Sequence, residues 1–220
     1  MSKVTGYQHH PLILRVTHWI NAAAMIVMIG SGWRIYNWHP ALPVDFIFPP
    51  VVSLGGDPVL SQPIHTEDGL ASALMWHFGA MWVLVANLLV YLGYGIFSGH
   101  FRRDFLPLSP RAFLRDFMDA ARGRLAHRLG EYNAVQRVFY WGVLAAMAVT
   151  ILSGLGIWKP VQFQALTALF GGYEAARVVH FLGMTAIVAF LAVHLALALL
   201  VPQTIKAMIT GHAGTKEVQS

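Results

Sequence analysis

The feature that most constrains this chain is an apolar stretch, residues 177–200, that carries two histidines. As a helix rising about 1.5 Å per residue, the stretch is long enough to cross a bilayer. His180 and His194 are fourteen residues apart, so a helix brings both rings to one face and separates them by about 21 Å along its axis. One histidine then lies toward each membrane surface. Because ionisable side chains inside a span are costly, both are candidates for a functional site.

Composition indicates an integral membrane protein. Hydrophobic residues make up 56% of the 220 residues and charged residues only 11%, whereas a soluble domain is about one quarter charged. Cysteine is absent, which excludes disulfides, iron–sulfur clusters held by this chain and haem attached covalently through cysteine. Any metal must therefore be held by other donors, of which histidine is the first candidate.

Apolar runs predict four transmembrane helices, so the expected fold class is an all-α integral membrane four-helix bundle. We treat residues 1–220 as one membrane domain with a polar tail at 203–220. The spans are expected at about 16–36, 70–97, 134–158 and 175–201. Between them, the proline-rich segment 37–69 predicts a loop with Phe46, Ile47 and Phe48 at the membrane surface. An amphipathic helix is expected over 110–129.

The distribution of basic residues predicts the orientation. Of the 15 lysines and arginines, 12 fall in the N-terminal segment, the loop at 98–137 and the C-terminal tail. The positive-inside rule therefore places both termini in the cytoplasm, an N-in/C-in topology. No signal peptide is evident, because the first apolar run is long enough to span. The arginines at 102–128 predict contact with membrane lipid head groups and not with nucleic acid.

Four of the 11 histidines fall inside predicted spans: His18, His77, His180 and His194. Because the helix directions alternate, depth pairs His77 with His180 near the outer surface and His18 with His194 near the inner one. Two imidazole pairs are typical of two bis-histidine haem sites, which favour electron transfer over oxygen binding. A packing role stays open for His77 taken alone. A haem-free metal or proton carrier is a further alternative, although no Asp or Glu lies inside a predicted span.

Three motifs resemble a known family: Arg15-Val16-Thr17-His18-Trp19, Trp76-His77-Phe78-Gly79 and the His180/His194 pair. They are similar to those of bacterial di-haem cytochrome b of the b-561/Ni,Fe-hydrogenase cytochrome b type, over about 16–205. The resemblance implies a multi-pass protein of the bacterial inner membrane with two b-type haems. Their iron would be bound by His18 and His194 on the cytoplasmic side, and by His77 and His180 on the periplasmic side.

The resemblance also implies electron transfer in a respiratory chain, between quinone and a partner oxidoreductase. The partner would be a hydrogenase, a molybdopterin enzyme or a c-type cytochrome, and the long outer loop favours a docked partner. Arg15, Arg34 and Arg177 lie at span ends, where a guanidinium can pair with a haem propionate or simply anchor the helix at the interface.

No catalytic residue is predicted, so we expect an electron-transfer subunit and not a complete enzyme. The alternative is a self-sufficient quinol oxidase that reduces a diffusible acceptor such as superoxide. The sequence leaves open the identity of the partner, the direction of electron flow, the face that binds quinone and assembly into a homo-oligomer.

Overall fold

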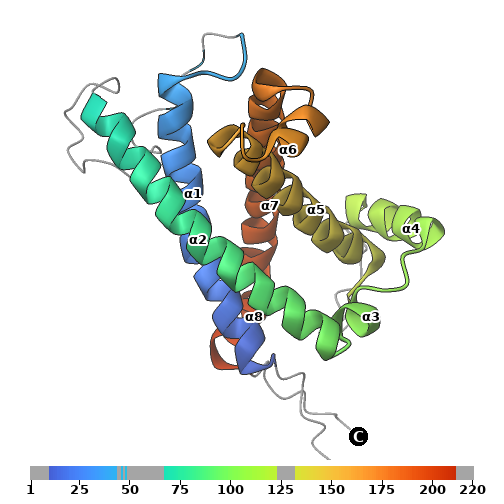
Figure 1. The fold of residues 1–220 in the computed structure, drawn as a ribbon. Coiled ribbons are helices and arrows are strands. Elements are labelled where there is room, and N and C mark those ends of the chain that lie inside the picture. The colour runs from blue at the N-terminus through green and yellow to red at the C-terminus, as the bar shows by residue number, and fades with distance from the viewer. Residues whose placement is uncertain (1–9, 44–45, 47, 49–66, 123–131, 212–220) are drawn as a thin grey trace, which may run out of the picture. The chain divides into compact units, whose positions relative to one another are not determined.

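A computed structural model describes residues 10–43, 46, 48, 67–122 and 132–211 of the chain. Within these residues all regular secondary structure is helical, as Figure 1 shows in chain order. The helices are α1 (Leu12–Trp38), α2 (Glu67–Phe97), α3 (His100–Asp104), α4 (Pro110–Ala121), α5 (Ala134–Trp158), α6 (Gln164–Leu169), α7 (Tyr173–Leu200) and α8 (Pro202–Thr210).

Helices α1, α2, α5 and α7 are long and apolar enough to cross a membrane. They confirm the all-α membrane fold, and α5 has the predicted bounds. Helix α1 begins four residues before the predicted start, and α7 begins at Tyr173. Each helix satisfies its own backbone hydrogen bonds, which is what a lipid environment requires, and apolar side chains on all its sides suit contact with lipid.

Two compact units divide the chain, and each draws on all four long helices. The first unit comprises residues 1–17, 91–144 and 189–220, and the second comprises 18–90 and 145–188. The prediction that residues 1–220 form one domain stays a prediction.

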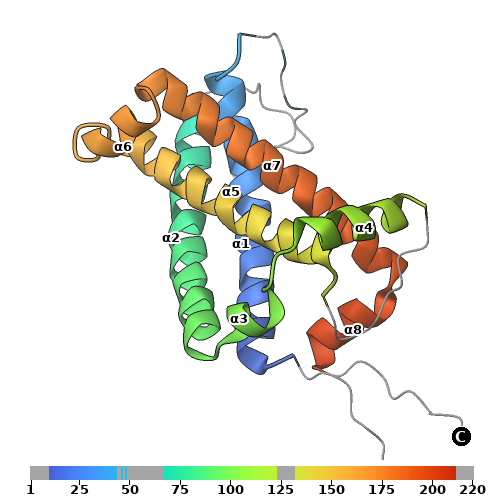
Figure 2. The ribbon, with the colours of Figure 1, turned by 90° about the vertical axis from the view of Figure 1, so that its right-hand side faces the viewer.

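In the second unit, the short helix α6 closes the turn between α5 and α7, as Figure 2 shows. The Thr167 hydroxyl donates to the Gly156 carbonyl of α5 at 3.0 Å. At the far end of α6, Gly171 and Gly172 turn the chain into α7 with φ angles of 87° and 102°, which favour glycine. The sequence predicted only a connection here, because six residues are too few to show a helical period.

Phe48 packs against the end of α1, and its place at the membrane surface stays a prediction. Asn37, near the end of α1, donates to the Phe48 carbonyl and accepts from the Phe48 N–H, both at 2.8 Å. The Phe48 ring stacks on Trp33 with centroids 4.7 Å apart, and Tyr36 contacts its edge. Phe46 is half exposed, and Ile47 lies outside the described residues.

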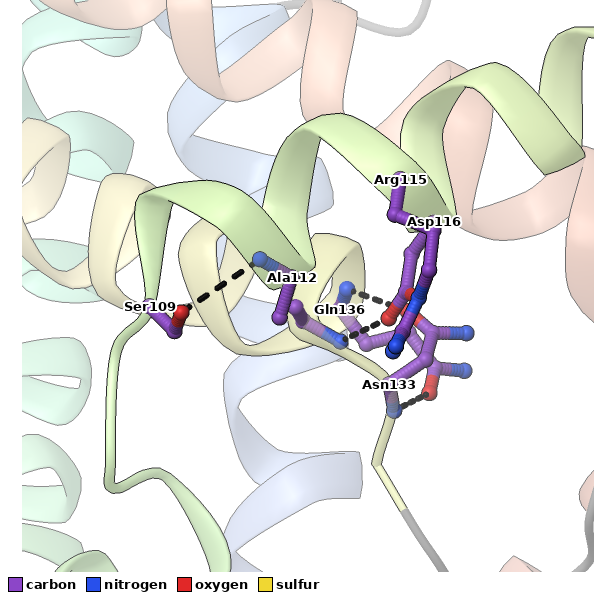
Figure 3. Close-up of polar contacts among 7 residues, drawn as sticks. Ser109, Ala112, Arg115, Asp116, Asn133 and Gln136 are labelled. Atoms are coloured by element: carbon purple, nitrogen blue, oxygen red, sulfur yellow. Dashed lines mark hydrogen bonds and ion pairs between the residues drawn. The ribbon is translucent and has the colours of Figure 1, made fainter.

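In the first unit, helix α4 begins as predicted at Pro110. The side chain of Ser109 accepts from the Ala112 N–H at 3.3 Å and so caps the helix (Figure 3). The helix ends at Ala121. Residues 123–129 of the predicted amphipathic helix lie outside the described part of the chain.

Asp116 joins α4 to the start of α5. Its buried carboxylate accepts from the Ala134 N–H at 2.9 Å and from Arg115 at 3.0 Å. The Ala134 N–H is the main cause that lowers the pKa of Asp116, burial opposes it, and Arg115 adds to the lowering. Asn133 and Gln136 cap α5 reciprocally, each accepting from the backbone N–H of the other (Figure 3).

Helix α8 lies in the segment that was expected to be only a polar tail. Pro202 occupies its first turn, where a missing N–H costs nothing, and Gly211 ends it with a φ angle of 84°. Nine residues with few apolar positions gave no clear helical period.

Candidate functional site

His77, on α2, is held by a serine on α1. Ser31 is fully buried, and its hydroxyl donates to the Val27 carbonyl at 2.6 Å. A hydroxyl has one proton, so Ser31 Oγ acts as acceptor in its 3.0 Å contact with His77 Nδ1. The Met28 carbonyl is also within reach of this ring. Nδ1 of His77 therefore carries a hydrogen, and Nε2 keeps its lone pair.

His180, on α7, has the same arrangement with α5. The Ser153 hydroxyl is fully buried and donates to the Val149 carbonyl at 2.7 Å. His180 Nδ1 lies 2.8 Å from the Thr150 carbonyl and 3.3 Å from Ser153 Oγ. A carbonyl can only accept, so Nδ1 of His180 donates and its Nε2 also keeps a lone pair.

The two rings lie close together inside the second unit. Their centroids are 6.3 Å apart and their planes meet at 66°. Within the described residues, the hydrogen bonds of both rings are made by Nδ1, and neither Nε2 has one. Two imidazoles with the proton fixed on Nδ1 present two Nε2 lone pairs, which suits them to bind a metal as neutral ligands.

Glycines adjoin both serines and set how closely each ring approaches a helix. A Cβ added at Gly154 would lie 2.9 Å from His180 Cε1, closer than side chains approach. At Gly32 the corresponding distance to His77 Cε1 is 3.5 Å, an ordinary contact. A Cβ at Gly183 would also collide with the Thr150 hydroxyl. Helices α5 and α7 therefore approach each other through small residues, as membrane helices often do.

An internal repeat, which the pattern analysis missed, underlies the likeness of the two histidine environments. Eleven of 21 positions are identical between 15–35, RVTHWINAAAMIVMIGSGWRI, and 137–157, RVFYWGVLAAMAVTILSGLGI. Nine of 20 are identical between 73–92, ALMWHFGAMWVLVANLLVYL, and 176–195, ARVVHFLGMTAIVAFLAVHL.

The repeat is also visible in the packing. Both members of four counterpart pairs are buried: Met25 and Met147, Ser31 and Ser153, Ala73 and Ala176, Leu84 and Ile187. The shared Ser-Gly pair and the shared His-Phe pair are the signals that could have revealed Ser31 and Ser153 from sequence. The repeat also aligns His18 with Tyr140, and His194 with Tyr91.

His18 and His194 lie on the helices where they were expected. The His18 ring makes an edge contact with Trp19, with centroids 5.3 Å apart. His194 stacks on Phe190 at 5.6 Å, and α7 runs unbroken from His180 to His194. His18 belongs to the second unit and His194 to the first, so their pairing stays a prediction.

Arg15 lies at the C-terminal end of α8. Its Nη2 donates to the Ile209 carbonyl, and its Nη1 is close to Gly211. A cation in this place stabilises the carbonyl end of a helix. The Nε atoms of Arg15 and Arg34 are buried and have no hydrogen-bond partner within the described residues.

Arg177 is engaged with the chain that follows α1. It donates to the carbonyls of His39 at 2.7 Å and Pro40 at 3.0 Å, and pairs with Glu174 at 2.6 Å. These bonds support its reading as an anchor. Binding of a haem propionate by Arg15, Arg34 or Arg177 stays a prediction.

Comparison with known proteins gives three informative relatives and a family. The family described as prokaryotic cytochrome b561 matches residues 9–211. The putative protein-methionine-sulfoxide reductase subunit YedZ1 of Azospira oryzae is 49% identical over 207 residues, covering 94% of this chain and 98% of the relative. In Escherichia coli K12, the cytochrome b556(fdo) subunit of formate dehydrogenase is 22% identical and covers 90% of this chain and 81% of its own. The nitrate-inducible cytochrome b556(Fdn) subunit of the same organism is also 22% identical and covers 96% of this chain and 86% of its own.

Proposed function

Because the chain belongs to the prokaryotic cytochrome b561 family, we propose that it is a di-haem cytochrome b that passes electrons between quinone and a partner oxidoreductase. The family consists of membrane electron-transfer subunits, and its name implies b-type haem. The four apolar helices make the chain a multi-pass membrane protein. The bacterial inner membrane is the proposed location. The observation that supports the proposal most is the geometry of His77 and His180.

The separation of the two rings fits one metal between them. Two metal–nitrogen bonds of about 2 Å, each extended by the radius of an imidazole ring, add up to about 6 Å. The observed centroid distance is 6.3 Å. Within the described residues, no group of three or more His, Cys, Asp or Glu gathers to hold a metal. The remaining ligands would therefore come from a macrocycle, which is what haem provides.

In this proposal, the chain's own residues hold the imidazoles and fix their protons. Ser31 holds His77, and the Thr150 carbonyl with Ser153 holds His180, so both Nε2 atoms are presented as neutral ligands. A bound b-type haem supplies a centre that gains and loses one electron at a time. If His77 and His180 both bound the iron of such a group, the site would be suited to electron transfer and not to binding a substrate.

A second haem is proposed at His18 and His194, on the spacing of the histidines along α7. Fourteen helical residues separate the two sites by about 21 Å, which gives electrons a stepwise path across the membrane. Of the three arginines predicted at span ends, Arg34 and Arg15 are proposed to bind propionates, because each keeps a buried Nε without a partner in the described chain.

For the partner, we propose a reductase of protein methionine sulfoxide. The support is the 49% identity to a relative named as a subunit of such an enzyme, over nearly the whole of both chains. A reductase consumes electrons, so the proposed direction is from quinol through this chain to the reductase.

Haem stoichiometry of the purified protein tests the cofactor. We expect about two b-type haems per chain by alkaline pyridine spectrum against an independent protein assay. His77→Ala and His180→Ala should each remove the same haem, while His39→Ala, whose residue lies beyond the end of α1, should remove none. A value of zero in haem-replete cells would refute the cytochrome and leave the metal or proton carrier.

Reoxidation of the quinol-reduced protein tests the partner. We expect rapid reoxidation when the purified reductase and a methionine sulfoxide peptide are both present, and slow reoxidation when either is omitted. Fast reoxidation by superoxide without the reductase would contradict the docked partner and favour the self-sufficient quinol oxidase.

A further inference from the structure

The internal repeat marks two tyrosines that correspond to proposed haem ligands. Tyr91 on α2 is the counterpart of His194, and Tyr140 on α5 is the counterpart of His18. Both tyrosines belong to the first unit. We propose that Tyr91 and Tyr140 bind the head group of a quinone and that the nearby His100–Asp104 pair carries its protons. This inference rests on the proposed exchange of electrons with quinone.

The two tyrosines lie at the same depth in their helices. Tyr91 is six residues before the end of α2 at Phe97, and Tyr140 is six residues after the start of α5 at Ala134. Each therefore lies about 9 Å inside its helix end. This is the shallow part of a membrane span, which a lipid-dissolved molecule with a polar ring can reach from the bilayer.

Aromatic rings surround the tyrosines. Tyr140 stacks on Phe105 with centroids 5.3 Å apart, and Tyr132 meets its edge at 5.2 Å. Phe101 contacts Tyr91 at 5.5 Å, and Trp141 at 6.1 Å. Such a cluster offers flat apolar faces to a quinone ring.

The phenol groups supply the polar part of the site. Phe101 and Phe105, whose ring centroids are 5.5 Å apart, connect Tyr91 to Tyr140, and Tyr132 adjoins the Tyr140 ring. The three residues are partly buried, and each carries a hydroxyl that can donate one hydrogen bond. Three phenol donors beside aromatic faces match a ligand with two carbonyl oxygens on a flat ring, which is the chemistry of a quinone.

His100 and Asp104 provide a proton acceptor beside this cluster. His100 is buried, its ring contacts that of Phe105 at 5.2 Å, and its Nδ1 lies 2.6 Å from Asp104 Oδ2. Arg103, which is largely exposed, pairs with the same carboxylate at 3.1 Å. The carboxylate thus orients the imidazole, and its own side chain is 17% exposed, so a proton taken up by the pair can pass to solvent.

Among the described residues, His10 interacts electrostatically with His100 and Tyr132 with Asp104, and Arg15 interacts with His10. Burial, the charge of His100 and the charge of Arg15 lower the pKa of His10, so His10 favours its neutral form. Burial and the charge of Asp104 raise the pKa of Tyr132, so this phenol keeps its proton. In this environment Tyr132 can donate a hydrogen bond, and His100 is the base beside the ring.

The reaction at the site is the oxidation of quinol to quinone. Two O–H bonds of the quinol would break, and the two b-type haems of the proposed function would be the oxidant, taking up one electron each. His100 Nε2 accepts each proton in turn, Asp104 stabilises the resulting imidazolium, and the proton passes to solvent. The tyrosine hydroxyls donate hydrogen bonds to the oxygens of the quinone that forms.

Stopped-flow reduction of the haem-loaded protein in lipid nanodiscs tests this site, with decylubiquinol and menadiol as probes. Tyr91→Phe and Tyr140→Phe should raise the KM for quinol about fivefold, since each loses one hydrogen bond. His100→Gln should lower the maximal rate about a hundredfold and remove its rise with pH. Reduction by dithionite and haem content should not change. Tyr173→Phe makes the same chemical change in the second unit and should have no effect.

The outcomes separate the two proposals. If neither quinol reduces the wild-type protein, the proposed exchange with quinone fails. If quinol reduces the wild type and all the variants at equal rates, the assignment of the site fails. Should His100→Gln lose haem, Asp104→Asn replaces it, and an unchanged pH profile in that variant would overturn the proton role.

Discussion

Around His180, helices α5 and α7 come so close that glycine is required at both Gly154 and Gly183. Around His77, α1 and α2 leave an ordinary contact distance of 3.5 Å at Gly32. The hydrogen bonds of the two histidines also differ. His180 donates to a backbone carbonyl at 2.8 Å, whereas His77 has a hydrogen bond to a serine hydroxyl at 3.0 Å.

The part of the repeat in α1 and α2, the His77 half, uses side-chain hydrogen bonds between its helices. The part in α5 and α7, the His180 half, uses close packing. Asn87 of α2 donates to Asn21 of α1 at 2.6 Å, and the counterparts of these residues in the repeat are Phe190 and Val143. Thus one repeated segment can hold a histidine either through tight helix contact or through side-chain hydrogen bonds. The His180 half should therefore be sensitive to added volume, and the His77 half to lost polar groups.

The largest expected effect is that of a methyl group added beside His180, compared with one added beside His77. Gly154→Ala forces the His180 ring to move, at a cost of about 1–3 kcal/mol. We expect the haem of this site to be lost from the purified protein. Gly32→Ala has room and gains about 0.5–1 kcal/mol from the better helix former. Haem content by pyridine spectrum, with thermal unfolding, measures both. Equal haem loss in the two variants would break the comparison.

Removing the serine hydroxyls should weaken haem binding more at His77 than at His180. Ser31→Ala takes away the 3.0 Å hydrogen bond between His77 and a side chain. We expect haem affinity to fall about tenfold, the lower end for groups that orient a ligand, because the Met28 carbonyl remains near. Ser153→Ala leaves His180 its bond to Thr150 and should change affinity little. Transfer of haem to apomyoglobin measures the affinities. A reduction potential that shifts in Ser31→Ala and not in Ser153→Ala would show the same difference between the two sites.

The sequence predicted the spans and placed the histidines on them, because hydrophobic length and a fourteen-residue spacing are local patterns. It did not predict that Phe48 packs on Trp33 or that Arg15 meets α8, since both contacts join segments distant in sequence. The repeat was present in the sequence but hidden, because its two parts are displaced by different numbers of residues. The contacts of Ser31 and Ser153 revealed the alignment.

Smaller effects should follow from loosening each half at the end of α1 or of α5. Asn37→Ala removes two hydrogen bonds to the Phe48 backbone and should destabilise the protein by about 1–2 kcal/mol. Thr167→Val removes the bond from α6 to Gly156 and should cost about 1 kcal/mol. Both variants should keep full haem content, with a lower unfolding temperature as the readout. Haem loss in Asn37→Ala alone would show that the Phe48 contact also supports His77.

The smallest expected effect concerns the asparagine pair between α1 and α2. A hydrogen bond between membrane helices contributes about 0.6 kcal/mol on average, so Asn87→Leu should destabilise the His77 half by about that amount and leave the Asn21 amide without this partner. The His180 half has apolar residues at both counterpart positions. The double variant Asn21→Val/Asn87→Leu should therefore recover stability relative to the single one.

A double-mutant cycle of unfolding in sodium dodecyl sulfate, followed by haem release, isolates the coupling between these two residues. Recovery in the double variant would show that the polar link and the apolar pair are interchangeable solutions within the repeat. If instead the double variant is less stable than either single variant, the asparagines contribute separately. The His77 half would then depend on polar groups in a way that close packing cannot replace.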